Sequence, residues 1–164
     1  MENLWTENLR KVEPYVPGEQ SKEKDIIKLN ANENPYPPSP AVFEAIRNFN
    51  CAGLRLYPDA DAGELKAAIA RFYNVRKENV FIGNGSDDVL ALSFQAFFNS
   101  EKPIAYPDIT YSFYPVWCEL FGIPYKTYPL KSDFRINAAD YKEENGGVVI
   151  PNHRSARAGI LLKK

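Results

Sequence analysis

The sequence predicts an α/β fold, in which an N-terminal arm precedes a mainly parallel sheet that has helices on its faces and is incomplete at the last residues. Two observations predict it. From residue 80 onward, short apolar runs alternate with longer amphipathic stretches, as in parallel strands joined by crossover helices. The last apolar run ends at Ile150, where a parallel strand would feed another crossover, and few residues follow it. The expected strands span 80–82, 103–106, 124–129 and 148–150, and the expected helices span 86–98, 111–121 and, shorter, 137–144.

Prolines interrupt the first part of the chain, so we expect an arm there instead of a core. The arm carries Leu4 and Trp5 but cannot enclose a core of its own, so it packs either on its own domain or on a partner subunit. The 164 residues are long enough for one domain with a substantial core. We expect an arm at 1–38, part of a larger domain at 39–152 and a divergent tail at 153–164.

Two further helices are predicted before residue 80. Ser39 followed by Pro40 has the residue types that favour an N-cap and the first helical position. Asp61 and Glu64 have the spacing of a capping box, which predicts the start of the second helix. The apolar stripes of the two helices are Val42, Phe43, Ile46 and Phe49, and then Leu65, Ala68, Ile69 and Phe72.

The stretch N-V-F-I-G-N-G-S-D-D-V at 79–89 combines a short apolar run, a glycine turn and the start of a helix. Gly83 and Gly85 permit backbone angles that let amide N–H groups converge at the helix start, where the helix dipole favours a phosphate. A P-loop is excluded because no lysine follows Gly85, and a dinucleotide fingerprint is excluded because Asp88 stands where its third glycine would be. From these residues alone, an ordinary strand-to-helix turn with Ser86 as its N-cap is the favoured interpretation.

Charge and cysteines exclude several classes of protein. The 20 basic and 21 acidic residues give a net charge of −1, which offers no electrostatic reason for a nucleic-acid or anionic-membrane partner. The longest apolar runs are too short to span a bilayer. Cys51 and Cys118 lack metal-ligand spacing, so we expect no metal site, and the chain shows no secretory signal pattern. We therefore expect a reduced, cytoplasmic setting.

Five short motifs occur together in one order: Y-V-P-G at 15–18, K-L-N-A-N-E-N-P at 28–35, L-Y-P-D at 56–59, G-N-G-S-D-D at 83–88 and T-Y-S-F-Y at 110–114. With them the chain resembles the N-terminal portion of the histidinol-phosphate aminotransferases, which are pyridoxal-phosphate enzymes of fold type I. The resemblance implies a homodimer that exchanges the amino group between a small phosphate substrate, histidinol phosphate, and 2-oxoglutarate in histidine biosynthesis. Threonine-phosphate decarboxylases and aromatic aminotransferases are related alternatives.

The resemblance also implies roles for single residues. Gly85, Ser86 and Asp87 match the turn that holds the cofactor phosphate, and Tyr111 matches the aromatic residue that stacks on the pyridine ring. Tyr57 matches a tyrosine that reaches the phosphate in the partner subunit's site. Without the resemblance, Tyr111 is better explained as a core tyrosine and Tyr57 equally well as a turn residue.

Three more residues take implied roles near the substrate and cofactor. Asn32 and Tyr36 lie in the segment that closes over the substrate, and Asn152 matches an asparagine near the cofactor's phenolic oxygen. The sequence then departs from the family pattern P-N-P-N-x-P-T-G, which puts the role of Asn152 in doubt and makes His153 a poor catalytic candidate.

No catalytic residue can be assigned in this sequence. The family's Schiff-base lysine, its carboxylate on the pyridine nitrogen and its substrate arginine fall in the half that follows these motifs. Lys163 and Lys164 lack the family's lysine motif and are better interpreted as a solvated tail. We therefore expect the isolated chain to be inactive, and a non-catalytic remnant that binds phosphate compounds or an intact subunit stays an alternative.

Overall fold

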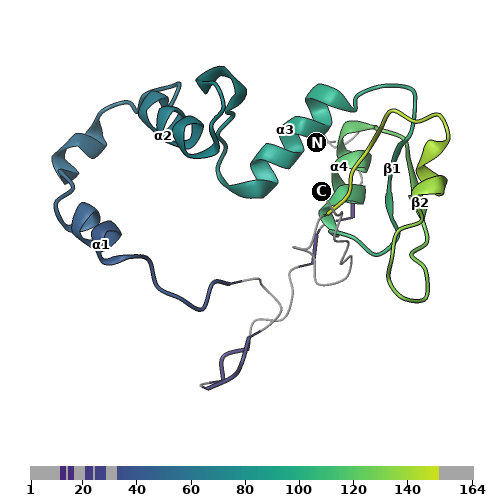
Figure 1. Cartoon of the computed structure of the whole chain (residues 1–164), viewed down its shortest axis with the longest axis horizontal. Coiled ribbons are helices and arrows are strands. Elements are labelled where there is room, and N and C mark those ends of the chain that lie inside the picture. The colour runs from purple at the N-terminus through teal and green to yellow at the C-terminus, as the bar shows by residue number, and fades with distance from the viewer. Residues whose placement is uncertain (1–11, 14, 17–20, 24, 29–32, 152–164) are drawn as a thin grey trace, which may run out of the picture. The chain divides into compact units, whose positions relative to one another are not determined.

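The computed structural model describes residues 33–151 and, before them, residues 12–13, 15–16, 21–23 and 25–28. The predicted sites Asn32 and Asn152, the tail and most of the arm lie outside the described residues. The chain divides into two compact units, one made by residues 33–89 and the other by residues 1–32 together with 90–164 (Figure 1). Each unit is described by itself below.

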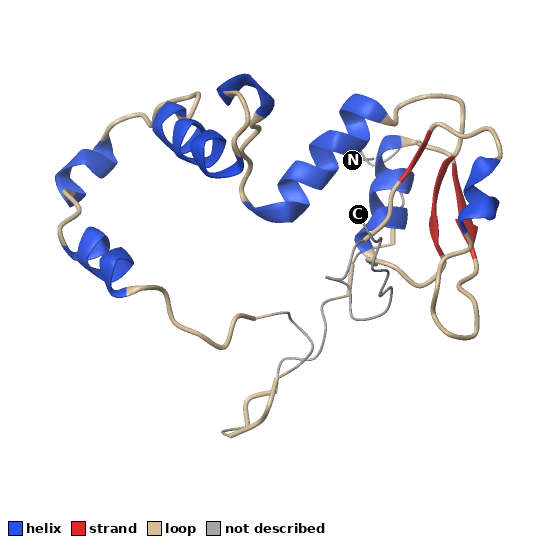
Figure 2. Ribbon diagram, viewed as in Figure 1, coloured by secondary structure: helices blue, strands red, loops and turns tan. Residues whose placement is uncertain are grey.

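The first unit contains helices α1 (Pro40–Arg47) and α2 (Gly63–Tyr73) and the 3-10 turns η2 (Cys51–Arg55) and η3 (Lys77–Asn79) (Figure 2). α1 begins directly after Ser39 with proline in its first turn, as predicted. It ends before Phe49, which lies outside the helix, and none of its residues is buried. The expected apolar stripe is therefore present on α1 but is not covered within this unit.

The start of α2 differs from the predicted capping box. Its N-cap residue is Ala62, whose backbone is left-handed with a φ of 47°, and Ala62 has no side chain that could cap. Asp59 takes over this role, because its Oδ2 accepts a hydrogen bond from the Gly63 N–H. Asp61 forms ion pairs with Lys66 and Lys77 instead. The interpretation of Asp61 as the cap was thus wrong, because the chain turns once more before the helix begins.

Helix α3 (Gly85–Phe97) has a largely apolar sequence after its first turn, yet Phe94 is its only buried residue among those described. Leu92 is 40% exposed and Phe97 is 76% exposed, so apolar side chains of this helix meet solvent. The apolar composition of a helix does not itself supply the neighbours that bury it.

In the part of the chain that the structure describes, the sheet has three parallel strands, β1 (Ile104–Pro107), β2 (Tyr125–Tyr128) and β3 (Gly147–Val148), in the order β2-β1-β3. Ile104 of the central strand pairs with Tyr125 on one side and Gly147 on the other. This confirms an α/β fold with a short parallel sheet. The strand predicted at 80–82 is absent, although Val80 is extended, because a strand also needs a hydrogen-bonded neighbour and no described strand pairs with it.

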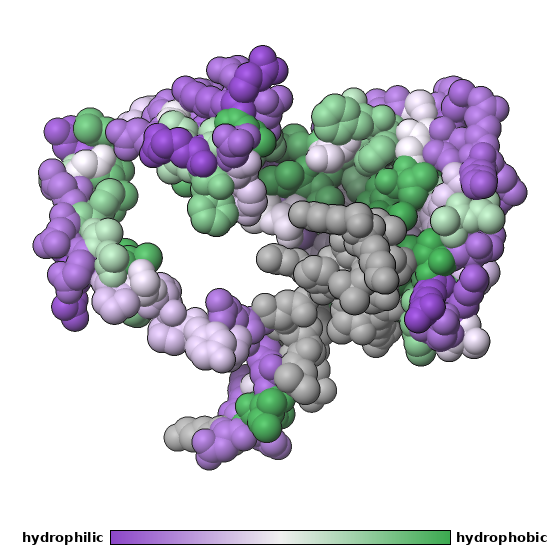
Figure 3. Space-filling view, in the orientation of Figure 1, coloured by the Kyte–Doolittle hydropathy of each residue, from purple (hydrophilic) through white to green (hydrophobic). Residues whose placement is uncertain are grey.

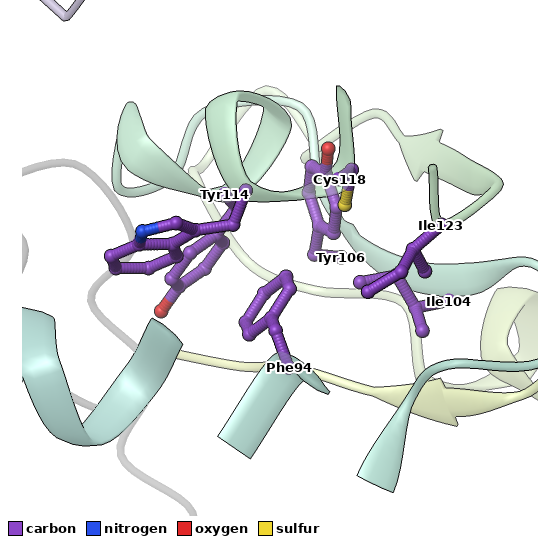
Figure 4. Packing of buried hydrophobic residues seen from close by; sticks show 7 residues of the cluster. Phe94, Ile104, Tyr106, Tyr114, Cys118 and Ile123 are labelled. Atoms are coloured by element: carbon purple, nitrogen blue, oxygen red, sulfur yellow. The ribbon is translucent and has the colours of Figure 1, made fainter. Parts of the chain in front are cut away.

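The core of the second unit joins helices to the central strand (Figure 4). Phe94 comes from α3, Tyr106 from β1 and Trp117 from α4 (Phe113–Phe121). α4 ends at Phe121, where the predicted helix also ends, and its C-cap Gly122 has a φ of 69°, a left-handed backbone that glycine adopts easily. The buried members of the cluster are Phe94, Ile104, Tyr106, Tyr114, Trp117, Cys118 and Ile123.

Large apolar side chains also reach the surface, where green residues lie among purple ones (Figure 3). In the unit of residues 33–89 they include Ile46, Leu54 and Phe72, each more than half exposed. No helix among the described residues has the length and apolar character needed to cross a membrane.

Candidate functional site

The glycine turn ahead of α3 has a backbone that only glycine adopts easily at one position. Gly85 has a φ of +84° and donates its N–H to the carbonyl oxygen of Gly83 at 3.0 Å. A Cβ placed on Gly85 would meet no atom within 4 Å, so conformation and not crowding requires glycine here. The turn therefore leaves open space beside the first residue of the helix.

Gly83 is required for the opposite reason, which is close packing. A Cβ on Gly83 would lie 2.8 Å from Asp88 Oδ2 and 2.8 Å from Val89 Cγ2. The same Asp88 oxygen accepts a hydrogen bond from the Asn84 N–H at 2.9 Å. The carboxylate thus reaches back over the turn from inside the helix and fixes its shape, a contact that the sequence analysis did not predict.

The helix start offers hydrogen-bond donors to an anion. α3 has 13 residues and begins at Gly85, one residue earlier than predicted, and Ser86 and Asp87 follow in its exposed first turn. Amide N–H groups in a first turn have no carbonyl partner within their helix, and the positive end of the helix dipole lies there. Together with the open space at Gly85, this arrangement fits a phosphate group.

Tyr111 lies in the other compact unit, in the loop that follows β1, and is half-buried. Its ring meets Tyr114 edge-on, with 5.8 Å between centroids and 84° between planes. Phe113 and Trp117 lie 5.7 and 6.1 Å from it, centroid to centroid. Tyr111 therefore belongs to an aromatic cluster but keeps part of its surface accessible, so both a packing role and a stacking role are compatible with its position.

The loop that carries Tyr111 is fixed by an acidic residue that the sequence analysis missed. Asp108 directly follows β1, and its Oδ1 accepts hydrogen bonds from the N–H groups of Ile109 at 2.8 Å and Leu130 at 3.0 Å. Its own N–H donates to the Tyr128 carbonyl. This ties the loop after β1 to the loop after β2, at the strand ends where ligands collect in parallel sheets. The sequence signal that could have identified Asp108 is its position immediately after an apolar strand.

The remaining predicted residues are exposed or outside the described part. Tyr57 is fully exposed, at 101%, in the segment after η2. Tyr36 is 79% exposed, and its N–H donates to Asn34 Oδ1 at 3.0 Å. Gly85, Ser86 and Asp87 are brought together in one turn, whereas no described contact of Tyr57 or Tyr36 joins them to that turn.

The side chains of Tyr106 and Cys118 are ionisable and lie buried in the core. Burial raises the pKa of the Cys118 thiol to about 11, and burial also raises the pKa of Tyr106 well above its ordinary value. Both groups are therefore neutral near pH 7, and neither is a nucleophile there. Cys51 is exposed, and neither cysteine forms a disulfide. No group of three histidine, cysteine or acidic side chains in the described part is arranged to hold a metal ion.

Comparison with known proteins shows to which protein family the chain belongs. Residues 24–156 match the sequence profile of the family described as aminotransferase class I and II, and the chain belongs to this family. It is 55% identical over 148 residues to the histidinol-phosphate aminotransferase of Lactococcus lactis subsp. cremoris, covering 90% of this chain and 42% of that protein. It is 54% identical over 162 residues to histidinol-phosphate aminotransferase 1 of Methylococcus capsulatus, covering 99% of this chain and 45% of that protein. The chain thus spans less than half the length of these relatives.

Proposed function

We propose that this chain is the N-terminal part of a pyridoxal-phosphate-dependent histidinol-phosphate aminotransferase. The reaction would exchange the amino group between histidinol phosphate and 2-oxoglutarate, in the cytoplasm, as a step of histidine biosynthesis. The observation that carries the proposal is the turn at Gly85, whose left-handed backbone and open helix start fit a phosphate within a chain of the aminotransferase family. High identity to several histidinol-phosphate aminotransferases supports this substrate over those of other family members.

The residues of the turn would hold the cofactor by its phosphate. The Ser86 hydroxyl and the N–H groups of the first turn of α3 would donate to the phosphate oxygens, and the helix dipole would favour the negative charge. These donors are backbone N–H groups and a hydroxyl, so the proposed site uses no cationic side chain of the first turn, whose charged residues are Asp87 and Asp88. When bound, pyridoxal phosphate supplies an electron sink for charge that develops on the substrate carbon.

Tyr111 would set the orientation of the cofactor ring. A flat aromatic face excludes water from one side and holds the ring parallel to itself. The Asp108 hydrogen bonds to Ile109 and Leu130 fix the start of the loop that presents Tyr111. A fixed loop reduces the conformational entropy that the site would lose on binding.

The other proposed contacts involve a second subunit and the substrate. Tyr57 would reach the cofactor phosphate of the partner in a homodimer, and its complete exposure in this chain leaves its hydroxyl available. Tyr36 and Asn32 would lie toward the substrate, and Asn152 toward the phenolic oxygen of the cofactor. These are the roles of the matching residues in the family, and the exposure of Tyr36 is compatible with a contact to the substrate.

The phosphate site is tested by comparing deoxypyridoxine phosphate with deoxypyridoxine, because neither has an aldehyde that reacts with lysines. We expect the chain to bind the phosphorylated compound more tightly in equilibrium dialysis. Ser86→Ala should weaken that binding by roughly tenfold, the usual worth of a hydrogen bond to a charged group. Gly85→Ala should also weaken it, because the left-handed backbone at Gly85 is strained in any other residue.

The matched control is Gly122→Ala. Gly122 also has a positive φ, of +69°, and open space beside it, so its substitution brings a similar strain away from the turn. If Gly122→Ala weakens binding as much as Gly85→Ala, the effect comes from general destabilisation. Equal affinity for the two compounds would remove the basis for a phosphate site in this turn.

A further inference from the structure

The motif Y-V-P-G at 15–18, of which the structure describes the first two residues, has no role in the proposed function. Its first residue, Tyr15, stacks on Phe113 at the start of α4, with ring centroids 4.3 Å apart and planes 24° apart. Tyr15 and Phe113 are both half-buried. The contact therefore joins a segment near the N-terminus to a helix almost a hundred residues later in the same compact unit.

The aromatic contacts continue from Phe113 toward Tyr111. Phe113 also stacks on Trp117, one helical turn further along α4, at 5.1 Å and 24°. Trp117 is buried at 5% exposure and belongs to the core. The Phe113 ring in turn lies 5.7 Å from the ring of Tyr111 at 40°. Phe113 is thus in contact with the arm, with the core and with Tyr111.

The stack joins the described arm to the start of α4. Beside it lies a hollow of about 250 Å³, lined by Val16 of the arm and by Pro115 and Val116 of α4 among others. The arm is therefore not packed continuously on the helix at this place. Tyr15 itself lines this hollow, so loss of its ring should enlarge the hollow and leave one face of Phe113 without its stacking partner.

The plane of a tyrosine ring is set mainly by its neighbours. The torsion about the bond to the ring has a broad energy minimum, so packing decides the angle. Tyr114 contacts Tyr111 edge-on, and Phe113 and Trp117 supply the other close rings. A change in the orientation of Phe113 therefore changes the orientation that Tyr111 prefers.

The geometry points to Tyr15 as a positioning residue, which acts through Phe113 to fix the ring of Tyr111. The cofactor-stacking role of Tyr111 rests on the proposed function, whereas the coupling between the three rings does not. On this inference, the Y-V-P-G motif of the arm belongs to the site although Tyr15 itself does not touch the cofactor. A role limited to holding the arm would leave Tyr111 unaffected.

Fluorine NMR of the full chain labelled with fluorotyrosine tests the coupling without any ligand. The resonance of Tyr111 is assigned by its loss in Tyr111→Phe. We expect Tyr15→Leu to shift or broaden it, and Phe113→Leu to do the same. Tyr15→Phe keeps the ring and should preserve the wild-type environment of Tyr111. The matched control is Tyr73→Leu, since Tyr73 is 68% exposed and its ring contacts Phe72 in the other compact unit.

Two outcomes would overturn the inference. In the first, the Tyr111 resonance stays unchanged in Tyr15→Leu or in Phe113→Leu. In the second, the resonances of the core residues Tyr106 and Tyr114 move as much as that of Tyr111, which would show a general loss of structure and not a positioning effect.

Binding of deoxypyridoxine phosphate gives the second measurement. Tyr15→Leu and Tyr111→Leu should each weaken it by roughly threefold to tenfold, in line with the worth of an aromatic contact, and the double variant should be no weaker than Tyr111→Leu alone. Additive effects would contradict a role through Tyr111. If the wild-type chain does not prefer the phosphorylated compound at all, the proposed function fails, while the resonance of Tyr111 still decides whether Tyr15 positions it.

Discussion

The carboxylate of Asp59 accepts a hydrogen bond from the backbone N–H of Gly63, with 2.7 Å between Oδ2 and N. Its other oxygen accepts the N–H of Asp61 at 3.0 Å. The Asp59 side chain thus accepts hydrogen bonds from two backbone N–H groups in the segment that leads from the L-Y-P-D motif into α2. Because Tyr57 lies two residues before Asp59, this hydrogen bonding also restrains the backbone that carries Tyr57.

Replacement of Asp59 by alanine should loosen the start of α2. We expect faster amide hydrogen exchange at Gly63 in Asp59→Ala, whereas Asp59→Asn should retain much of the protection because its carbonyl oxygen still accepts. Asp61→Ala is the control, since Asp61 pairs with Lys66 and Lys77 and not with the Gly63 N–H. Equal exchange at Gly63 in both alanine variants would show that Asp59 does not cap the helix.

Because of the hydrogen bond from the Gly63 N–H to Asp59, the stability of the start of α2 should depend on pH. The Gly63 N–H, followed by the Asp61 N–H, lowers the pKa of Asp59 below its usual 3.8. A lowered pKa in the folded chain means that the stabilisation is present above the unfolded value and is lost as the pH falls through the folded value. Protection of Gly63 should therefore hold down to about pH 4 and decline below it, and Asp59→Asn should remove this decline.

Helix ends were predictable where a local residue type decides them. Ser39 with Pro40 was correctly placed at the start of α1, because proline restricts φ. The end of α4 at Phe121 was also correct, and Gly122 supplies its left-handed C-cap. The cap of α2 was not predictable in the same way. Ala62 adopts a left-handed backbone without having a residue type that favours it, and this extra turn moves the capping role from Asp61 to Asp59.

Features that depend on distant neighbours could not be derived from local patterns. The run at 80–82 has the composition of a strand, but pairing decides whether a strand forms. In the candidate site, the glycine turn before Ser86 was found from the sequence because glycine and helix-start signals are local. The contacts of Asp108 with Leu130 and of Tyr15 with Phe113 join segments far apart in the chain, and no periodicity in the sequence indicates them.

Gly146, which directly precedes β3, should be among the least replaceable residues beside the sheet. A Cβ on Gly146 would lie 2.5 Å from the backbone carbonyl oxygen of Lys102, which cannot move without disturbing β1. We expect Gly146→Ala to lower the free energy of unfolding by about 1–3 kcal/mol, as overpacking typically does. Urea denaturation measures this change. Gly53→Ala is the matched control, because a Cβ there meets nothing within 4 Å, and an equal loss in both variants would contradict the crowding argument.

Two phenylalanines of α3 should differ sharply in their contribution to stability. Phe94 is fully buried, at 0% exposure, and its ring lies between 5.4 and 5.7 Å from those of Trp117, Phe98 and Tyr114. Phe94→Ala should therefore cost about 3–5 kcal/mol, the range for large-to-small changes in a core. Phe97 is 76% exposed on the same helix, so Phe97→Ala should change stability by less than about 0.5 kcal/mol. Thermal unfolding followed by circular dichroism distinguishes the two, and similar losses would mean that Phe97 is covered in solution.

The two cysteines should differ in their reaction with a thiol reagent. Cys51 is exposed, whereas Cys118 is buried, and burial raises the pKa of its thiol from 9.0 to about 11. The difference of two units leaves Cys118 with about a hundredfold less thiolate than an ordinary cysteine at pH 8, in addition to its lack of access. We expect one rapid equivalent to react in the native chain and the second only on unfolding. In Cys51→Ser the rapid phase should disappear, and a rapid phase that persists would place Cys118 at the surface.

The raised pKa of Cys118 also predicts how stability depends on alkaline pH. The folded chain favours the neutral thiol, so the stabilisation from this group is complete below the unfolded pKa of 9.0 and is lost as the pH rises toward about 11. Denaturant unfolding at a series of pH values should show the midpoint falling across this window. Cys118→Ala has no thiol to titrate and should flatten that part of the curve, although its cavity lowers stability at every pH. An equally steep fall in Cys118→Ala would assign the alkaline transition to other groups, of which Tyr106 is the nearest buried candidate, because burial raises its pKa as well.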